Sequence, residues 1–215
     1  MTDADAFIAA HTVVGVAPLV PQIRLHLADE ITPIWQASEA WLARNGIEPP
    51  FWAFAWPGGQ AMARHVLDHP ELVAGRRVLD FAAGGGIAAI ACAMAGAASV
   101  EAAEIDALAI AAIGLNARLN GVTIIPLADD VVGLASRWDL ILCGDVCYEA
   151  PMTRHILPWL RRCATTTRVH VADPGRAYLP GSGLEELARY DVATSLELED
   201  CTLRPTTIYR LLPAA

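Results

Sequence analysis

From Arg76 to Asp173 the sequence alternates short, unbroken apolar runs with segments of helical length. The apolar runs predict strands over 76–82, 98–104, 122–128, 138–145 and 166–173, and the segments between them predict helices over 87–96, 107–121 and 152–163. Buried strands separated by helices are typical of a parallel sheet with helices on both faces. The alternation therefore predicts a doubly wound α/β fold.

The two ends of the chain predict additions to this sheet. Residues 184–190 suit a helix, and residues 192–198 and 206–212 suit two closing strands. The segment between these strands is too short for a crossover helix, so we expect them to pair as a C-terminal antiparallel hairpin. Residues 1–50 suggest an N-terminal helical extension with proline breaks and a helix over 34–46, and 51–215 are expected to be the main domain, a single folded unit.

The composition excludes several classes of function. Hydrophobic residues make up 54% of the 215 residues and charged ones 18%, as in a globular domain. A net charge of -9 disfavours nucleic acid as a partner, and no apolar run is long enough to cross a membrane. The five cysteines form no CxxC pair, so we expect reduced thiols and no metal site. The N-terminus lacks the patterns of secretory and mitochondrial signals, which favours a cytoplasmic protein.

Polar and glycine residues gather where four of the predicted strands end. Ligands of open α/β sheets bind beyond the carboxyl ends of the strands, so these residues are the candidates for a site. They are Asp80, Gly84 and Gly86 after the first strand, Glu104 after the second, Asp129 after the third, and Gly144, Asp145 and Tyr148 after the fourth.

The spacing of the first two strand ends indicates a nucleoside cofactor. Glycines in a strand-to-helix turn can serve backbone geometry alone. Glu104, however, lies 20 positions beyond Gly84, near the spacing at which a carboxylate binds ribose hydroxyls. The last glycine of a dinucleotide-binding loop is missing, and Asp80 would repel a phosphate. S-adenosylmethionine, a sulfonium without phosphate, fits better than a dinucleotide, and Asp129 is expected to bind its adenine amine.

Longer motifs resemble a known family. VLDFAAGGGIAAIA, AEIDALAIAAIGLNARLNG and WDLILCGDVCY are similar to the class I seven-strand S-adenosylmethionine-dependent methyltransferases. PQIRLHLADEITPIW, FWAFAWPGGQA, the AAGGG loop, WDLILCGDVCYE and VADPGR together resemble the electron transfer flavoprotein β-subunit lysine methyltransferases, over most of the chain. The resemblance implies a Rossmann-like, mostly parallel seven-strand sheet. It also implies S-adenosyl-L-methionine as cofactor, S-adenosyl-L-homocysteine as product, and the electron transfer flavoprotein β subunit as protein substrate.

The resemblance also assigns roles in the WPGG segment and the glycine loop. Trp56 becomes a wall of the cofactor pocket, and Gly59 lets the backbone approach the cofactor closely. Trp52 and Phe54 are expected to be core residues. One departure is Ala82, which stands where the family usually has glycine, so its methyl group could crowd the methionine moiety.

The end of the fourth strand is expected to handle the acceptor amine. We predict that Asp145 orients the target ammonium and accepts or relays its proton, and that Tyr148 bounds the lysine channel. The alternative for Asp145 is an N-cap of the helix that begins near Pro151. Arg176, after the fifth strand, either touches the substrate protein or belongs to a simple turn.

Two other functions compete with this one. The cofactor motifs do not name the acceptor, so another protein, of the ribosomal-protein type, or a small amine could be the substrate. The Ala82 departure leaves open a nucleotide-binding module without catalysis.

Overall fold

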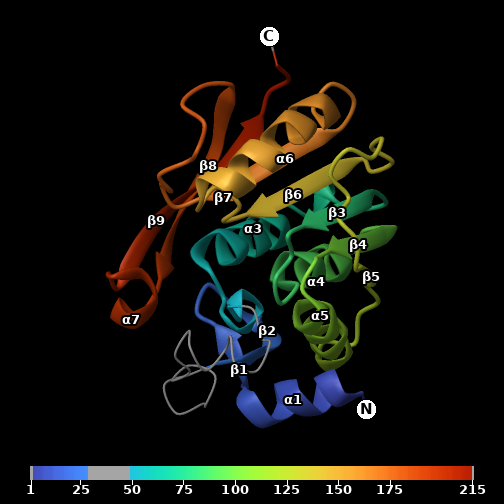
Figure 1. The fold of residues 1–215 in the computed structure, drawn as a ribbon, viewed down its shortest axis with the longest axis vertical. Helices are drawn as coiled ribbons and strands as arrows, with labels where there is room; N and C mark the ends of the chain where they lie inside the picture. Colours follow the sequence, from blue (N-terminus) through green and yellow to red (C-terminus); the bar gives the residue numbers. More distant parts are fainter. Residues whose placement is uncertain (1, 29–48, 215) are drawn as a thin grey trace.

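The computed structural model describes residues 2–28 and 49–214, and its centre is a seven-stranded sheet with the order β5-β4-β3-β6-β7-β9-β8 (Figure 1). Its strands are β3 (Arg77–Phe81), β4 (Ser99–Ala103), β5 (Ile125–Leu127), β6 (Leu140–Gly144), β7 (Arg168–Asp173), β8 (Leu184–Ala193) and β9 (Leu203–Leu211). The helices are α1 (Asp3–His11), α3 (Pro57–Asp68), α4 (Ile87–Met94), α5 (Ala107–Leu119), α6 (Ala150–Cys163) and the short α7 (Leu196–Glu199), with 3-10 turns η1 (Phe51–Ala53) and η2 (Pro70–Leu72).

Strands β3 to β7 are parallel, and β9 is antiparallel to both of its neighbours. The Rossmann-like, mostly parallel sheet with a C-terminal antiparallel hairpin is therefore confirmed. The register pairs Gly144 of β6 with Ala172 of β7, so Asp145 and Asp173 follow at neighbouring strand ends. The carboxyl ends of β3, β4, β6 and β7 thus meet at one edge of the sheet.

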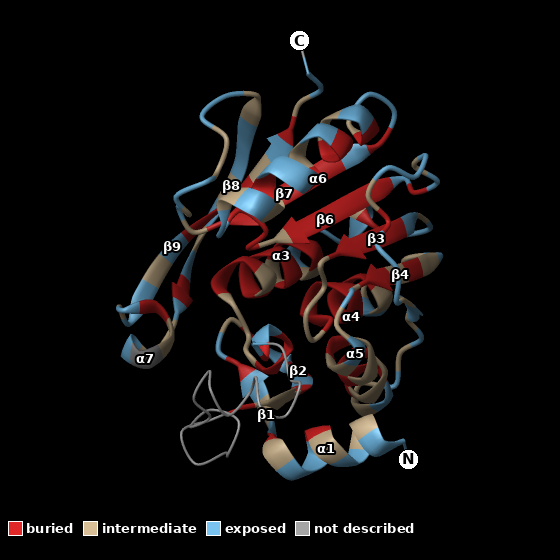
Figure 2. Cartoon of the chain, viewed as in Figure 1, coloured by how far each residue is buried: buried red, intermediate tan, exposed pale blue. Residues whose placement is uncertain are grey.

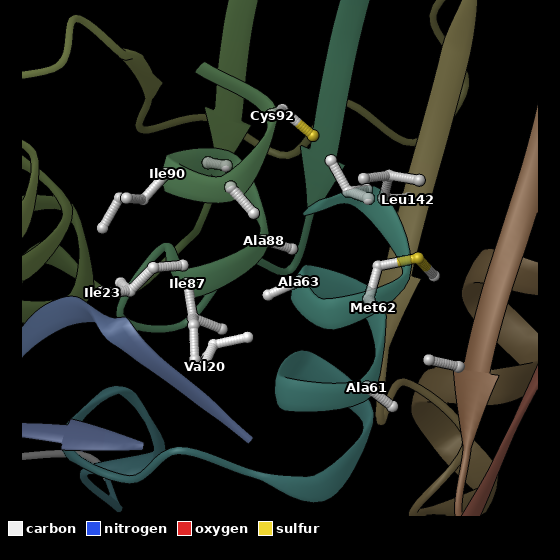
Figure 3. Packing of buried hydrophobic residues seen from close by; sticks show 14 of the residues in the cluster. Val20, Ile23, Ala61, Met62, Ala63, Ile87, Ala88, Ile90, Cys92 and Leu142 are labelled. Carbon is white, nitrogen blue, oxygen red and sulfur yellow. The ribbon is translucent and has the colours of Figure 1, made fainter. Parts of the chain in front are cut away.

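The two faces of the sheet are covered unequally. Helices α3 and α4 and part of α5 pack on one face, where Met62, Ala88 and Leu142 lie in one buried cluster (Figure 3). Helix α6 covers the other face through Trp159 and Leu160, packed on Leu79 and Ile141. Residues 128–139 and 174–183 form loops where a doubly wound fold often places helices. Among the described residues, no helix combines the length and apolarity of a membrane span.

The N-terminal region corrects one prediction. Helix α1 is present and begins with a capping box formed by Thr2 and Asp5. Residues 13–27, however, form an antiparallel hairpin of β1 (Val13–Ala17) and β2 (Val20–Leu27), not helix. Ile23 of β2 is buried in the same cluster as α3 and α4, so the hairpin shares the main core. The helix predicted over 34–46 lies outside the described residues, and the domain boundary near residue 51 stays a prediction.

The C-terminal hairpin is confirmed, but its first strand was wrongly placed. Residues 184–190, predicted as a helix, belong to edge strand β8, which pairs with β9 at the end of the sheet. Figure 2 shows β8 largely exposed, whereas β6 in the middle of the sheet is buried. The strand predicted over 192–198 ends at Ala193 and is followed by α7. A bulge between Glu186 and Ala188 interrupts the alternation of inward and outward side chains, which hides the period of a strand in the sequence.

Candidate active site

A pocket lies at the carboxyl ends of β3 and β6, where the loop after β3 faces β2 and the segment that leads into α3. Five of the predicted cofactor residues line it, namely Trp56, Gly59, Asp80, Gly84 and Gly144. Ala82 lines it as well. The position of the pocket is therefore the one predicted from the strand ends.

The loop after β3 has a left-handed backbone at three positions. Ala82, Gly84 and Gly86 have φ values of 53°, 54° and 80°, a region that glycine enters without steric cost. Gly86 precedes α4 and is not one of the described residues that line the pocket. A Cβ atom on Gly86 would lie 3.2 Å from Ile113 Cγ1 of α5. Gly86 therefore serves the packing of the loop on α5. Ala82 keeps the conformation that glycine would take, at a cost of about 1–2 kcal/mol.

Glu104, after β4, fixes the loop that follows β3 through a hydrogen bond. Its Oε1 accepts a hydrogen bond of 2.8 Å from the Gly84 N–H, and its Oε2 accepts one of 3.1 Å from the Ile105 N–H. Burial raises the pKa of the Glu104 carboxyl. The Glu104 carboxylate thus contacts the loop after β3, but Glu104 is not among the described residues that line the pocket. Its contact with a ribose stays a prediction.

Asp80 is the buried carboxyl group of the pocket. Its side chain is 3% exposed, and its Oδ2 accepts a hydrogen bond of 2.9 Å from the Ala89 N–H in the first turn of α4. Burial raises the pKa of Asp80 to about 8, and the nearby Glu104 carboxylate adds to the rise. The described lining contains no Arg or Lys that would neutralise this carboxylate.

Asp129 takes a different place from the other predicted residues. It is exposed in the loop after β5 and is absent from the described lining of the pocket. Its neighbour Asp130 binds the Val132 N–H and the His155 ring instead. The binding of adenine by Asp129 therefore gains no support from the geometry and stays a prediction.

Asp145 turns from the end of β6 toward the N-terminus of α3. Its φ is 57°, its Oδ2 accepts a short hydrogen bond from the Gly58 N–H, and its own N–H donates to the Ala172 carbonyl over 3.0 Å. Its Oδ1 accepts two hydrogen bonds from Arg176, from Nε at 3.1 Å and from Nη2 at 2.8 Å. Burial raises the pKa of Asp145 to about 6, against the opposing effect of Arg176.

The alternative role of Asp145 as the N-cap of α6 is wrong. The N-cap residue of that helix is Glu149, and the Asp145 carboxylate binds an N–H of α3 instead. Arg176, expected to touch the substrate protein or to belong to a simple turn, binds Asp145 and Glu199 through its guanidinium, and its contact with a substrate stays a prediction.

Three aromatic residues of the segment 51–56 line the pocket, namely Trp52, Phe54 and Trp56. The Trp56 indole Nε1 donates to the Phe51 carbonyl over 2.8 Å, and the Phe51 ring lies 5.6 Å from the Tyr148 ring. Tyr148 is 41% exposed and is not among the residues that line the pocket, so its place in a lysine channel stays a prediction. Trp52, expected in the core, is 2% exposed and also lines the pocket, so it belongs to both. Phe54, also expected in the core, is half-buried and lines the pocket too.

Several known proteins with similar sequences carry the same name. The electron transfer flavoprotein beta subunit lysine methyltransferase of Xenopus laevis is 38% identical over 217 residues, which covers 97% of this chain and 87% of that protein. The protein of the same name from Homo sapiens is 34% identical over 221 residues, with 97% and 82% covered. This chain belongs to the electron transfer flavoprotein beta subunit lysine methyltransferase family.

The methyltransferase character of this family member is visible in two further comparisons. A family model described as ribosomal protein L11 methyltransferase (PrmA) matches residues 61–144, from α3 to the end of β6. The crystal structure of magnesium protoporphyrin IX methyltransferase from Synechocystis PCC 6803 with bound SAM has a TM-score of 0.55 at 17% identity, and covers 73% of this chain and 80% of that one. That likeness supports the fold.

The pocket of this lysine methyltransferase suits a cationic nucleoside. Its described lining includes Asp80 and the aromatic residues Trp52, Phe54 and Trp56, and it contains no Arg or Lys. A sulfonium or ammonium group gains from an ionised carboxylate and from a ring face, whereas a phosphate gains from neither. Among the described residues no group of three His, Cys, Asp or Glu is arranged to bind a metal ion. The expectation of no metal stays a prediction.

Two residues of the site were missed by sequence reasoning. Asn116 of α5 is fully buried and lines the pocket; its Oδ1 accepts from the His26 N–H of β2 and its Nδ2 donates to the Gly85 carbonyl, both over 2.8 Å. Glu199 of α7 binds Arg176. A polar residue inside the apolar helix 107–121 was a usable signal for Asn116, whereas Glu199 lies among other acidic residues and had none.

Proposed function

We propose that this protein is an S-adenosylmethionine-dependent protein-lysine N-methyltransferase that acts on the β subunit of electron transfer flavoprotein. The observation that carries the proposal is the identity of 32–38% with relatives of that name, together with a pocket lined by a buried carboxyl group and by aromatic residues at the expected strand ends. The net charge of -9 favours a cationic segment of a protein, rather than nucleic acid, as the partner.

S-adenosylmethionine, when bound, supplies an electrophilic methyl group on a positively charged sulfur. Asp80, Trp56, Gly59, Gly84 and Gly144 would hold it, with Glu104 on the ribose. The Asp80 carboxylate would face the positive charge, and the left-handed Gly84 backbone would let the loop approach the ligand. Each of these residues is in or beside the pocket.

The target amine must lose a proton before it can react. A free lysine has a pKa of about 10.4, so only about one molecule in a thousand is neutral near pH 7.4, and reaching that state costs about 4 kcal/mol. Asp145 and Tyr148 lie at the end of β6, next to the pocket. We infer that Asp145 orients the ammonium and relays its proton, and that Tyr148 and Phe51 bound the lysine channel.

The bonding of Asp145 leaves room for one substrate contact. A carboxylate offers about four acceptor positions. Gly58 takes one, and the two Arg176 nitrogens take two more. The remaining position would receive the ammonium, and the fixed donors would hold the carboxylate in one orientation while it does so.

Methylation of the purified β subunit tests the proposal. The protein is incubated with S-adenosylmethionine and recombinant electron transfer flavoprotein, and the β subunit is digested and examined for methyl-lysine by mass spectrometry. The chain contains no lysine of its own, so every methyl-lysine must come from the acceptor. Cofactor binding by calorimetry without any methyl-lysine on the β subunit would contradict the proposed substrate.

A ribosomal protein is the second candidate acceptor. Ribosomal protein L11 methyltransferase from Dechloromonas aromatica is 35% identical over 159 residues, covering 73% of this chain but 50% of that protein. A parallel reaction with purified ribosomal proteins distinguishes the two candidates. In a reaction with radiolabelled S-adenosylmethionine and a cell extract, a small methylated product would indicate an amine acceptor.

Absence of labelled product from every acceptor would favour a binding module without catalysis. Cell fractionation tests the proposed cytoplasmic location.

A further inference from the structure

Four charged side chains form a continuous network from the end of β6 to α7. Arg176 lies between two carboxylates, with Nη2 at 2.8 Å from Asp145 Oδ1 and at 2.6 Å from Glu199 Oε1. Arg204 of β9 holds Glu199 from the other side, through Nε to Oε2 at 3.1 Å and Nη2 to the Glu199 carbonyl at 2.6 Å. Two cations and two anions alternate, so the network is neutral.

Burial makes this network more than a surface pairing. The Glu199 side chain is 1% exposed, the Asp145 side chain 10% and the Arg176 side chain 22%. Charged hydrogen bonds out of water are stronger and more directional than exposed ones, and a planar guanidinium fixes the plane of its partner. Glu199 therefore restricts Arg176, and Arg176 in turn restricts Asp145.

The backbone at Arg176 is fixed as well. Asp173, at the end of β7, accepts hydrogen bonds of 2.7 Å from both the Gly175 and Arg176 N–H groups through Oδ1. The Arg176 side chain then passes near Trp56 in the pocket wall, and its guanidinium carbon lies 6.0 Å from the centre of the Trp56 ring. The guanidinium is thus placed between the cofactor wall and the carboxylate that faces the acceptor.

We propose that Arg176, anchored by Glu199, is a positioning residue for methyl transfer that holds the Asp145 carboxylate in its productive orientation against the N-terminus of α3. This inference rests on the proposed function, because Asp145 is the residue that would meet the acceptor amine. Arg176 itself acts through Asp145.

The groups that contact Asp145 come from the end of β7 and from α3, and charged groups of α7 and β9 lie behind them. Arg176 and Asp173 face it from the end of β7, and the α3 N-terminus faces it through the Gly58 N–H. Glu199 of α7 stands behind Arg176, with Arg204 beyond it. Removal of the Arg176 charge raises the pKa of Asp145, since the effect of Arg176 opposes that of burial. Removal of the Glu199 charge leaves the cation in place and gives no such rise.

Two variants separate the positioning of the Asp145 carboxylate from the effect of the Arg176 charge. Arg176→Met removes both the fork and the charge, whereas Glu199→Gln removes the anchor and keeps the cation beside Asp145. Arg189→Met is the matched control, because Arg189 is an exposed arginine of β8 paired only with the exposed Glu186 among the described residues. For each protein we would measure kcat with the methyl acceptor, the KM for the cofactor, and the Asp145 carboxyl titration by carbon-13 NMR, assigned with Asp145→Asn.

The expected results differ between the variants. In Arg176→Met, kcat falls by about 100-fold, which is the loss in rate expected when a catalytic group is misplaced. The midpoint of the Asp145 carboxyl titration moves to higher pH. In Glu199→Gln, kcat also falls, although the midpoint does not rise. The control keeps the wild-type kcat within about twofold, and the cofactor KM changes little in all three.

Several results would overturn the inference. It fails if Arg176→Met keeps kcat within about twofold of the wild type. It fails equally if Glu199→Gln keeps the wild-type kcat, a result that decides the matter even when Arg176→Met does not fold. If the wild type methylates no acceptor, the proposed function fails, and the titration then decides alone: an unchanged Asp145 midpoint in Arg176→Met rejects the positioning role.

Discussion

Replacement of Gly58 by alanine sets two physical effects against each other. Gly58 is the second residue of α3, and alanine is more favourable than glycine in a helix by about 1 kcal/mol. Local propensity alone therefore predicts that Gly58→Ala is neutral or stabilising.

The surroundings of Gly58 predict the opposite sign. A Cβ atom there would lie 2.5 Å from Asp145 Oδ2, 2.7 Å from the Ala172 carbonyl oxygen and 2.7 Å from the Asp145 nitrogen. Two of these three atoms are backbone, so the strand ends or α3 must move. Overpacking costs about 1–3 kcal/mol, and the two backbone contacts place Gly58→Ala at the upper end of this range. Subtracting the helix gain of about 1 kcal/mol leaves an expected net loss of about 2 kcal/mol. A protein of this size then melts about 4–8 °C lower.

Urea unfolding of the variant and of Gly181→Ala provides the measurement. A Cβ at Gly181 meets no atom within 4 Å, so that control should stay within about 0.5 kcal/mol of the wild type. Gly58→Ala should also lose methyl transfer, because the Asp145 carboxylate is displaced. A variant as stable as the wild type, with its kcat intact, would show that the approach of α3 to β6 is not tight and would refute the reasoning.

Three further outcomes follow from the site. Asp145→Asn should lower kcat by about 100-fold or more while the cofactor affinity, measured by calorimetry, stays within about threefold; collapse of that affinity would move Asp145 into the cofactor pocket. Glu104→Ala should weaken cofactor binding by about tenfold or more, since it removes a charged hydrogen bond from the Gly84 N–H, whereas the exposed Asp129→Ala should weaken it less; equal losses would restore a role for Asp129. Cofactor binding near pH 7 should release a proton from Asp80, because its pKa of about 8 leaves the free carboxyl mostly protonated and a cation favours the ionised form. Calorimetry in buffers of different ionisation enthalpy should show this release and its loss in Asp80→Asn, and equal proton release in both proteins would assign it elsewhere.

The sheet could be predicted because its strands depend on local patterns. The strands β3, β6 and β7 are buried on both faces over almost their whole length, and their sequences are short, mainly apolar runs. The hairpin 13–27 was missed because Pro18 and Pro21 suggested helix breaks, although the former lies in the hairpin turn and the latter in β2. Edge strand β8 is mostly exposed, so its sequence carries no clean inward pattern.

The site was predictable where residues follow strand ends and unpredictable where distant segments meet. Asp80, Gly84 and Gly144 reach the pocket through the topology of the sheet alone. Asn116 reaches it because β2 packs on α5, a contact between residues about 90 positions apart that no local pattern encodes. The environment of Asp145 likewise depends on Arg176, which the sequence places 31 residues away.

The contact between Gly58 and Asp145 has a consequence for how such an enzyme can change. Trp56, two residues before Gly58, lines the pocket proposed for the methyl donor, while Asp145, the residue proposed to meet the acceptor, accepts a hydrogen bond from Gly58. Both are fixed to the same end of one helix. A substitution that widens the acceptor side to admit a different amine therefore also disturbs the donor side, and altered substrate choice in this scaffold should come with altered cofactor affinity.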